Sequence, residues 1–156
     1  MTTYREARIA VYNTLKTRVE ARVAALDELD DIPNYLFDDL GDDDFPNISK
    51  NTLVVYVRHY ASNQKTIGGE TRNLFERKAF ALVKVWVPKN NGLKVGDALA
   101  YIVKSAFEGK RALSPFNDII FRSVRVSEQG IIKDRLQITV TADFEYTEAV
   151  ERTETW

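Results

Sequence analysis

The sequence predicts an α+β fold, with an antiparallel sheet of about four strands and helices packed on one of its faces. Two segments, one near the N-terminus and one near the middle of the chain, repeat apolar residues at the three- to four-residue spacing of amphipathic helices. Four other segments are rich in β-branched and aromatic residues, as strands are. The expected order is helix, strand, strand, helix, strand, strand.

The size and composition of the chain predict one domain. It has 156 residues and a hydrophobic content of 44%, which suits a single core. We expect this domain to span residues 1–147, followed by a charged tail at residues 148–156. The chain contains no cysteine, so it forms no disulfide or thiolate metal site. No apolar run approaches the ~18 residues of a membrane span, and the charged N-terminus is unlike a signal peptide, so we expect a soluble protein of cytosolic origin.

The first helix begins at a capping box. Thr3 and Glu6 have the three-residue spacing at which a hydroxyl and a carboxylate satisfy the free N–H groups of a helix start. About six turns follow, with most basic residues away from the apolar stripe. The stripe consists of Ala7, Val11, Leu15, Val19, Val23 and Leu26.

An acidic segment follows this helix. Residues 27–44 carry nine carboxylates and no Lys or Arg, although the net charge of the chain is only −1. No helical or alternating period holds across the segment, which contains Pro33 and Gly41, so we expect an irregular connection. Clustered carboxylates suit Mg²⁺ or Ca²⁺, but the EF-hand spacing is missing, and a solvated acidic loop is favoured over a metal site.

Two strands are predicted next, at residues 52–62 and 77–88, joined by a long charged loop over residues 62–76. In the second strand Phe80, Leu82, Lys84 and Trp86 share one face, and five small apolar residues share the other. Since both faces are partly apolar, something must cover the second face as well as the first.

The second half of the chain predicts a helix and a hairpin. A turn at residues 90–92 precedes a helix with Asp97 in its first turn and Gly109 at its end. Residues 118–127 form a strand, and a turn around Gly130 leads to a longer one. From Leu136 to Tyr146 this last strand alternates strictly between apolar and polar residues, which predicts one buried and one solvated face.

The residues that carry catalytic chemistry do not assemble into a known pattern. The pair Gly68-Gly69 lacks the spacing of a phosphate-binding loop and leads into a strand. His59 is the only histidine, and we expect it to be structural. Arg122 and Arg125 fall on opposite strand faces, which weakens a nucleic-acid groove. We therefore expect no enzyme, no cofactor and no metal, and binding or assembly is the leading class.

Several stretches together resemble the tail terminator (tail completion) proteins of long-tailed phages and prophages, of the lambda type. They are the N-terminal helix, "QKTIGGETRNLFERKAFALVKVWVPKNNG", "DALAYIVKSAFEG", "FRSVRVSEQG" and "LQITVTADFEY". The similarity covers residues 4–147 and is strongest over residues 64–146. The acidic segment 27–44 and the tail after residue 147 depart from the family.

The resemblance implies a structural protein of the virion. Such proteins form a ring, typically a hexamer, on the head-proximal end of the tail tube, stop polymerisation of the tube protein and present a surface to the head connector. DNA would pass through the lumen without sequence readout, and assembly would take place in the host cytoplasm, without a membrane. In the family the loop at the position of Ser62–Glu76 projects from the body and engages the adjacent ring, while a neighbour covers the second sheet face.

The predicted contacts with the next subunit or with the tube lie mainly in this loop. Its apolar residues offer burial, its glycine pair allows a positive φ, and its arginines offer partners to carboxylates. The predicted interface residues are Gln64, Ile67, Gly68, Gly69, Arg72, Leu74, Phe75, Arg77, Phe80 and Trp86. We also expect a possible acidic interface at Asp42, Asp43 and Asp44, which would face a basic surface of the next subunit or of the connector.

Other readings stay open at this point. A tail tube protein or another head–tail joining protein shares the family's fold. A small-molecule-binding α+β regulator, or an enzyme that uses Asp and Glu pairs, would instead require a closed pocket lined by polar groups.

Overall fold

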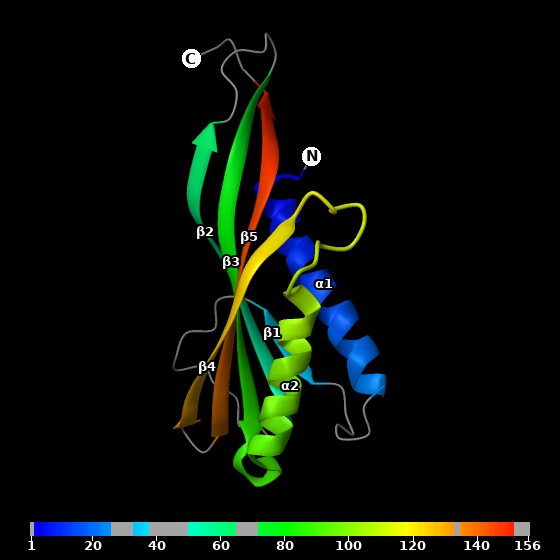
Figure 1. Ribbon diagram of the computed structural model, residues 1–156, viewed down its shortest axis with the longest axis vertical. Coiled ribbons are helices and arrows are strands. Elements are labelled where there is room, and N and C mark those ends of the chain that lie inside the picture. Colours follow the sequence, from blue (N-terminus) through cyan, green and yellow to red (C-terminus); the bar gives the residue numbers. More distant parts are fainter. Residues whose placement is uncertain (1, 26–32, 38–49, 65–71, 133–134, 152–156) are drawn as a thin grey trace.

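The computed structural model describes residues 2–25, 33–37, 50–64, 72–132 and 135–151. It contains two long helices and a five-stranded sheet, and the helices pack on the sheet, which confirms the α+β class (Figure 1). The strands run in the order β1-β2-β3-β5-β4. The elements are α1 (Tyr4–Ala25), β1 (Asn34–Phe37), β2 (Thr52–Gln64), β3 (Arg72–Pro88), η1 (Lys89–Asn91), α2 (Gly92–Phe107), β4 (Ile120–Ile132) and β5 (Arg135–Glu151).

Helix α1 begins where the capping box predicts. The Thr3 hydroxyl accepts a hydrogen bond from the backbone N–H of Glu6 at 3.2 Å, and the N–H of Ala7 donates to the Thr3 carbonyl at 2.9 Å. The apolar stripe of this helix is buried at Ala7, Val11, Leu15, Val19 and Val23. The sequence pattern therefore predicts the start and the buried face of α1 correctly, while the last residue of the predicted stripe, Leu26, lies outside the described residues.

The sheet is mixed, and it has one strand more than the sequence predicts. β1 pairs in parallel with β2, from Asn34 opposite Thr52 to Phe37 opposite Val55, whereas the other three pairings are antiparallel. The sequence predicts an irregular connection at these residues, so β1 is a correction to that prediction. A four-residue strand is too short to establish a period, and its aromatic residues are fixed by tertiary contact, because the Phe37 ring lies 4.7 Å from that of Tyr12 in α1.

The core lies between the two helices and one face of the sheet. β3 contributes five small residues that are fully buried, and α2 covers them together with the apolar face of β5. Helix α2 approaches the sheet closely at Gly96, where a Cβ atom would lie 2.8 Å from Leu136 Cδ2. The five residues of β3 are Ala79, Ala81, Val83, Val85 and Val87.

The second face of the sheet differs from expectation at Trp86. We predicted that a neighbouring subunit would cover this residue, but Trp86 is fully buried within the chain. Its indole Nε1–H donates to Gln137 Oε1 at 3.0 Å, and the Arg135 guanidinium carbon lies 3.8 Å from the ring centroid. The indole is therefore already buried in the single chain, and a contact of Trp86 with a neighbouring subunit stays a prediction. Phe80, on the same face, is partly exposed.

Three strands continue past the helices and form an arm. Figure 1 shows the upper ends of β2, β3 and β5 projecting beyond the N-terminal end of α1. We define the arm as Ala61–Gln64, Arg72–Lys78 and Tyr146–Glu151, which pair in an uninterrupted antiparallel register. The loop predicted over residues 62–76 is thus shorter, and β5 extends four residues past the predicted domain boundary at residue 147.

Candidate assembly interface

Strand alternation sorts the side chains of the arm onto two faces. Arg77 is opposite Ser62 in β2 and Tyr146 in β5, and these three lie on the face that carries the helices farther down the sheet. Phe75 and Glu148 are opposite each other on the same face. Leu74, Glu76 and Lys78 alternate with them and lie on the other face, in line with Phe80.

Arg77 links all three strands of the arm. Its Nε–H donates to Glu148 Oε2 at 2.9 Å, and its Nη1 donates to the Ser62 hydroxyl. Its guanidinium carbon also lies 4.8 Å from the centroid of the Phe75 ring. One side chain of β3 therefore holds residues of β2 and β5 in place, which gives the arm a defined shape.

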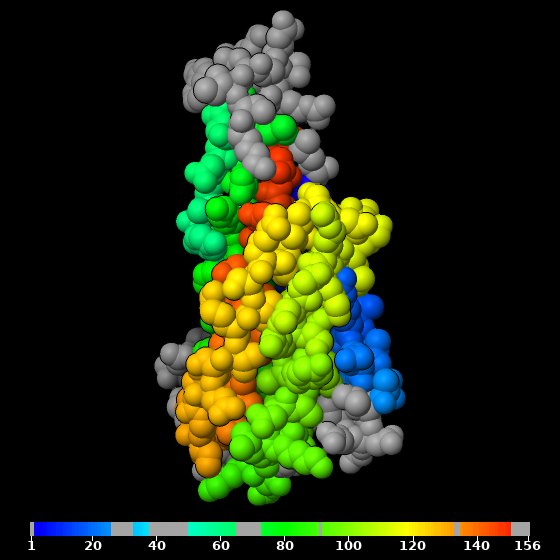
Figure 2. Space-filling view, in the orientation of Figure 1, coloured from blue at the N-terminus to red at the C-terminus, as the bar shows by residue number. Residues whose placement is uncertain are grey.

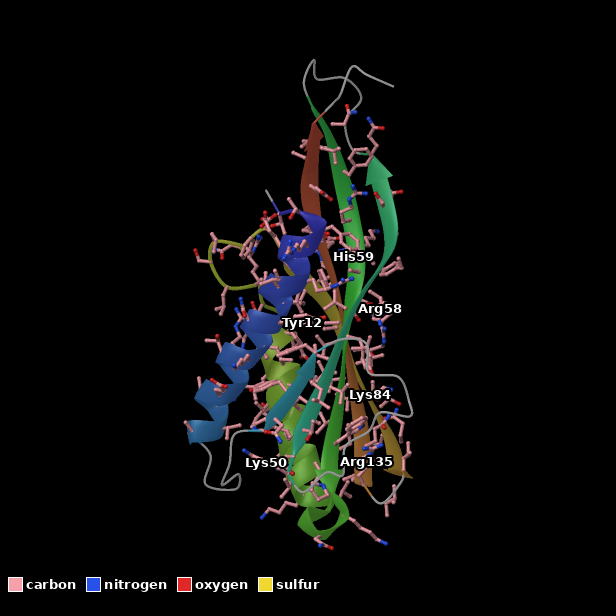
Figure 3. The ribbon with its side chains drawn as sticks, turned by 180° about the vertical axis from the view of Figure 1, so that it is seen from behind. Tyr12, Lys50, Arg58, His59, Lys84 and Arg135 are labelled. Carbon is pink, nitrogen blue, oxygen red and sulfur yellow. The ribbon has the colours of Figure 1, made fainter. Side chains whose placement is uncertain are left out.

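His59 joins the base of the arm to helix α1 (Figure 3). Its ring stacks on Tyr4 at a centroid distance of 3.7 Å, and its Nε2 is hydrogen-bonded to the Tyr146 hydroxyl at 2.7 Å. Burial, with added repulsion from Arg8 and Arg77, lowers the pKa of His59 to about 4. Burial also raises the pKa of Tyr146, so both groups are neutral near pH 7.

The opposite face of the arm base exposes aromatic surface. Tyr60 is 59% exposed, and its ring lies 6.2 Å from that of Phe80. The register of the β2–β3 pairing shifts between His59 and Ala61, as it does at a β-bulge, and Tyr60 is the residue between them. Exposed aromatic rings beside a strand edge are the kind of surface that protein interfaces use.

Both edges of the arm are open in the part of the chain that the structure describes. β1 pairs with β2 only as far as Val55, and the pairing of β4 with β5 ends at Glu145. The outer backbone edge of β2 after Val55 and that of β5 from Tyr146 onward therefore have no described strand beside them. Such edges are ready-made sites for pairing with another chain.

The structure brings part of the predicted interface together. Gln64, Leu74, Phe75 and Arg77 all lie in the arm, and Phe80 lies at its base. Arg72 is the first residue of β3, opposite Glu151. The predicted residues Ile67, Gly68 and Gly69, and the acidic triplet Asp42, Asp43 and Asp44, lie outside the described residues.

Two features of the arm and its base are not predicted from the sequence. Glu148 and Val150 belong to the third strand of the arm, but we had assigned them to a charged tail. The alternation of β5 weakens there, because Thr147, Glu148 and Ala149 give no clear apolar face. The ring contact between Tyr4 and His59 joins residues 55 positions apart in the sequence, and no local pattern reports such a pair.

The described residues show no group of three His, Cys, Asp or Glu side chains that would hold a metal ion. Neither helix of the described chain has the length and apolarity needed to cross a bilayer. The charged residues of the outer sheet face pair locally instead. Arg122 Nη2 lies 2.6 Å from Glu145 Oε1, and this contact lowers the pKa of that carboxyl, while Arg125 Nη1 lies 3.0 Å from Asp143 Oδ2.

Comparison with known proteins identifies a shared fold. No family model matches the chain, and no curated protein matches it either. A solved structure resembles it with a TM-score of 0.58 at 12% sequence identity, over 88% of this chain and 93% of that chain. The name of that protein states neither an organism nor a function. The chain therefore shares its α+β architecture with that protein almost from end to end, and at this identity the likeness concerns the fold alone.

Proposed function

We propose that this protein is a structural virion protein of the tail terminator type. It forms a ring, typically a hexamer, that caps the head-proximal end of a tail tube, stops polymerisation of the tube protein and joins the tail to the head connector. DNA passes through the lumen without sequence readout. Its partners are then further copies of itself, the tube protein and the connector, in the neck of the virion.

The observation that carries this proposal is the arm. It is a three-stranded sheet that extends past both helices, with two open edges and partly exposed apolar side chains such as Leu74 and Phe75. Beyond Tyr146, which packs on His59, no described helix or strand covers either face of this small sheet, and such a sheet buries little apolar surface by itself. Contact with another protein would bury these side chains and supply strand partners, which is what a ring-to-ring or ring-to-tube contact requires.

The position of the arm in the sequence supports the same function. Four of the residues that the tail terminator resemblance predicts as contacts, namely Gln64, Leu74, Phe75 and Arg77, project together from the body. The other described residues form an α+β body with a well-packed core. A body that carries one projecting arm suits a repeating assembly in which each copy grips its neighbour.

The experiment that tests this proposal is measurement of the native particle. We expect light scattering of the purified protein to give the mass of a closed ring, and negative-stain images to show single rings. Continuous filaments would identify a tube protein instead, because a tube subunit polymerises whereas a terminator stops. A monomer at every concentration would contradict the proposal.

A further inference from the structure

A charged groove lies between the two helices, on the side away from the sheet. It encloses about 320 Å³ and is open to solvent. Figure 2 shows α2 exposed on this side, with α1 beside it. The groove is lined by Arg22 from α1 and by Tyr101, Lys104, Ser105, Glu108 and Lys110 from α2 and the residues that follow it.

The positive charges that line the groove outnumber its negative charges. Lys104 Nζ lies 3.3 Å from Glu108 Oε2, but Lys110 Nζ donates to the neutral carbonyl of Ser105 at 2.5 Å. Arg22 is exposed. Within the described residues neither Arg22 nor Lys110 has a carboxylate partner. Two cations therefore remain beside an aromatic ring, that of Tyr101, which is 61% exposed.

The groove is also held in a fixed shape. Arg18 of α1 donates from Nη1 to the Ala106 carbonyl and from Nη2 to the Arg111 carbonyl, both at 2.6 Å. The first bond satisfies a carbonyl group in the last turn of α2, and the second reaches the segment that follows the helix, so both tie α1 to this end of α2 beside the groove. A ligand would therefore meet a groove whose two helices are already tied together, which lowers the entropic cost of binding.

We propose that this groove binds the acidic segment 38–44 of a second copy of the chain. That segment reads DDLGDDD, with five carboxylates around one leucine, and the same chain therefore supplies both the cations and a matching anionic peptide. Leu40 supplies an apolar group for the Tyr101 ring, and the carboxylates supply partners for Arg22 and Lys110. The inference rests on the proposed ring, since it describes a contact between neighbouring copies.

The arrangement of the elements favours a second copy over the same chain. The acidic segment follows β1, which is the edge strand of the sheet opposite to β4, whereas α2 packs against β5, β3 and β4. Figures 1 and 3, which are opposite views, show α2 in front in one and β1 in front in the other. A head-to-tail contact joins two different flanks of one molecule, so the β1 flank of one copy would meet the α2 flank of the next.

The first test is peptide binding. A labelled peptide of residues 36–46 is titrated with the full chain, and its fluorescence anisotropy is followed at low and high salt. We expect saturable binding that weakens at least tenfold in Arg22→Glu/Lys110→Glu and as the salt concentration rises. The control variant Arg5→Glu/Lys89→Glu makes the same charge change at exposed positions outside the groove and should bind like the wild type. A peptide with its five Asp residues changed to Asn should not bind.

The second test uses the absence of cysteine from the chain. Ser105→Cys and Asp43→Cys are introduced into separate chains, one of which carries a size tag, and the mixture is mildly oxidised. We expect a disulfide-linked heterodimer in excess of that formed by Lys89→Cys with Asp43→Cys. No excess, or peptide binding unchanged by the charge reversal, would overturn the inference. Neither measurement depends on ring closure, so the two proposals can fail separately. If the protein forms rings but does not bind the peptide, the groove is not the contact. If it binds the peptide but forms no rings, the proposed function is wrong.

Discussion

His59 and Trp86 illustrate two ways in which this protein holds a polar aromatic group inside an apolar sheet. Each side chain is hydrogen-bonded to a residue of β5, His59 to Tyr146 and Trp86 to Gln137. Each also has a ring or a cation against its face, Tyr4 in the first case and Arg135 in the second. The partner replaces the hydrogen bond to water that the Trp86 N–H and the His59 Nε2 lose on burial, whereas His59 Nδ1 is buried without a hydrogen-bond partner among the described residues.

The low pKa of His59 predicts a loss of stability in mild acid. The pKa is about 4 in the folded protein and near 6.5 when the chain is unfolded, so between these values the unfolded state binds more protons. The stabilising contribution is complete above pH 6.5, falls as the pH drops below it, and is lost near pH 4. We expect the free energy of unfolding, measured with urea, to fall by about 1–2 kcal/mol more between pH 7 and 5 than in His59→Phe. Parallel pH profiles for the two proteins would contradict this.

Trp86→Phe should destabilise the body without affecting the arm. The change leaves Gln137 Oε1 without its indole donor and removes part of the ring under Arg135. The expected loss is about 1–3 kcal/mol in the free energy of unfolding, by thermal or urea denaturation. Tyr60→Phe, on an exposed ring, serves as the control and should change the free energy by less than about 0.5 kcal/mol. Equal effects of the two changes would refute the assignment of Trp86 to the interior.

At the scale of elements, helix α2 depends on close approach to the sheet. Gly96 allows this contact, since a Cβ atom there would lie 2.8 Å from Leu136 Cδ2 and 3.3 Å from Ile138 Cδ1. Both atoms are the ends of flexible side chains, so a methyl group requires only local repacking. A larger side chain cannot be accommodated by the same repacking, because Val87 Cγ2 lies 3.7 Å from the same Cβ position and closes the site on a third side.

Gly96→Leu is therefore expected to lower the free energy of unfolding by about 1–3 kcal/mol through overpacking, despite the better helix propensity of leucine. Circular dichroism during thermal denaturation measures the change. Asp97→Leu places the same side chain at the exposed neighbouring position and should be close to neutral. If Gly96→Leu were as stable as Asp97→Leu, α2 would not pack as closely as described.

The elements differ in how well the sequence predicts them, and the difference has a physical cause. α1, α2 and the alternating part of β5 each have one face in the core over many residues, so their periods are long enough to recognise. β1 has only four residues. Its pairing with β2 is parallel, so the two strands are not joined by the tight turn that marks a hairpin in a sequence. The sequence predicts a loop at residues 62–76 and a tail at residues 148–156 because the arm buries little there, and the apolar-polar contrast that marks a strand is weak. Of the predicted interface, the residues of the arm lie together, but the interior position of Trp86 depends on contacts with β5 that no local pattern encodes.

At the scale of the whole molecule, the arm and the body should respond independently to substitution. The body has its own core, whereas the arm is held by the pairing of three strands and by Arg77. A change at an exposed part of the arm can therefore abolish assembly while the body remains folded.

We expect Leu74→Asp/Phe75→Asp to reduce the particle mass, or to prevent rings from binding one another or a tube, with an unfolding transition within a few degrees of the wild type. Light scattering and thermal denaturation of the same samples measure the two properties. Lys16→Asp/Asn13→Asp places charge on exposed positions of α1 and serves as the control. Normal assembly of the arm variant would show that the arm does not make the contact on which the proposed function rests.

The pairing of β3 with β5 also determines when the sheet can form during synthesis. Its partners are far apart in the chain, from Pro88 opposite Arg135 to Arg72 opposite Glu151. β2 and β3 can pair as soon as both have left the ribosome. The edge of β3 that later pairs with β5 then stays unpaired until β5, the last strand, has been synthesised. During that interval the nascent hairpin exposes an unpaired backbone edge to other chains, and a chaperone bound to this intermediate would protect the same edge that β5 later covers.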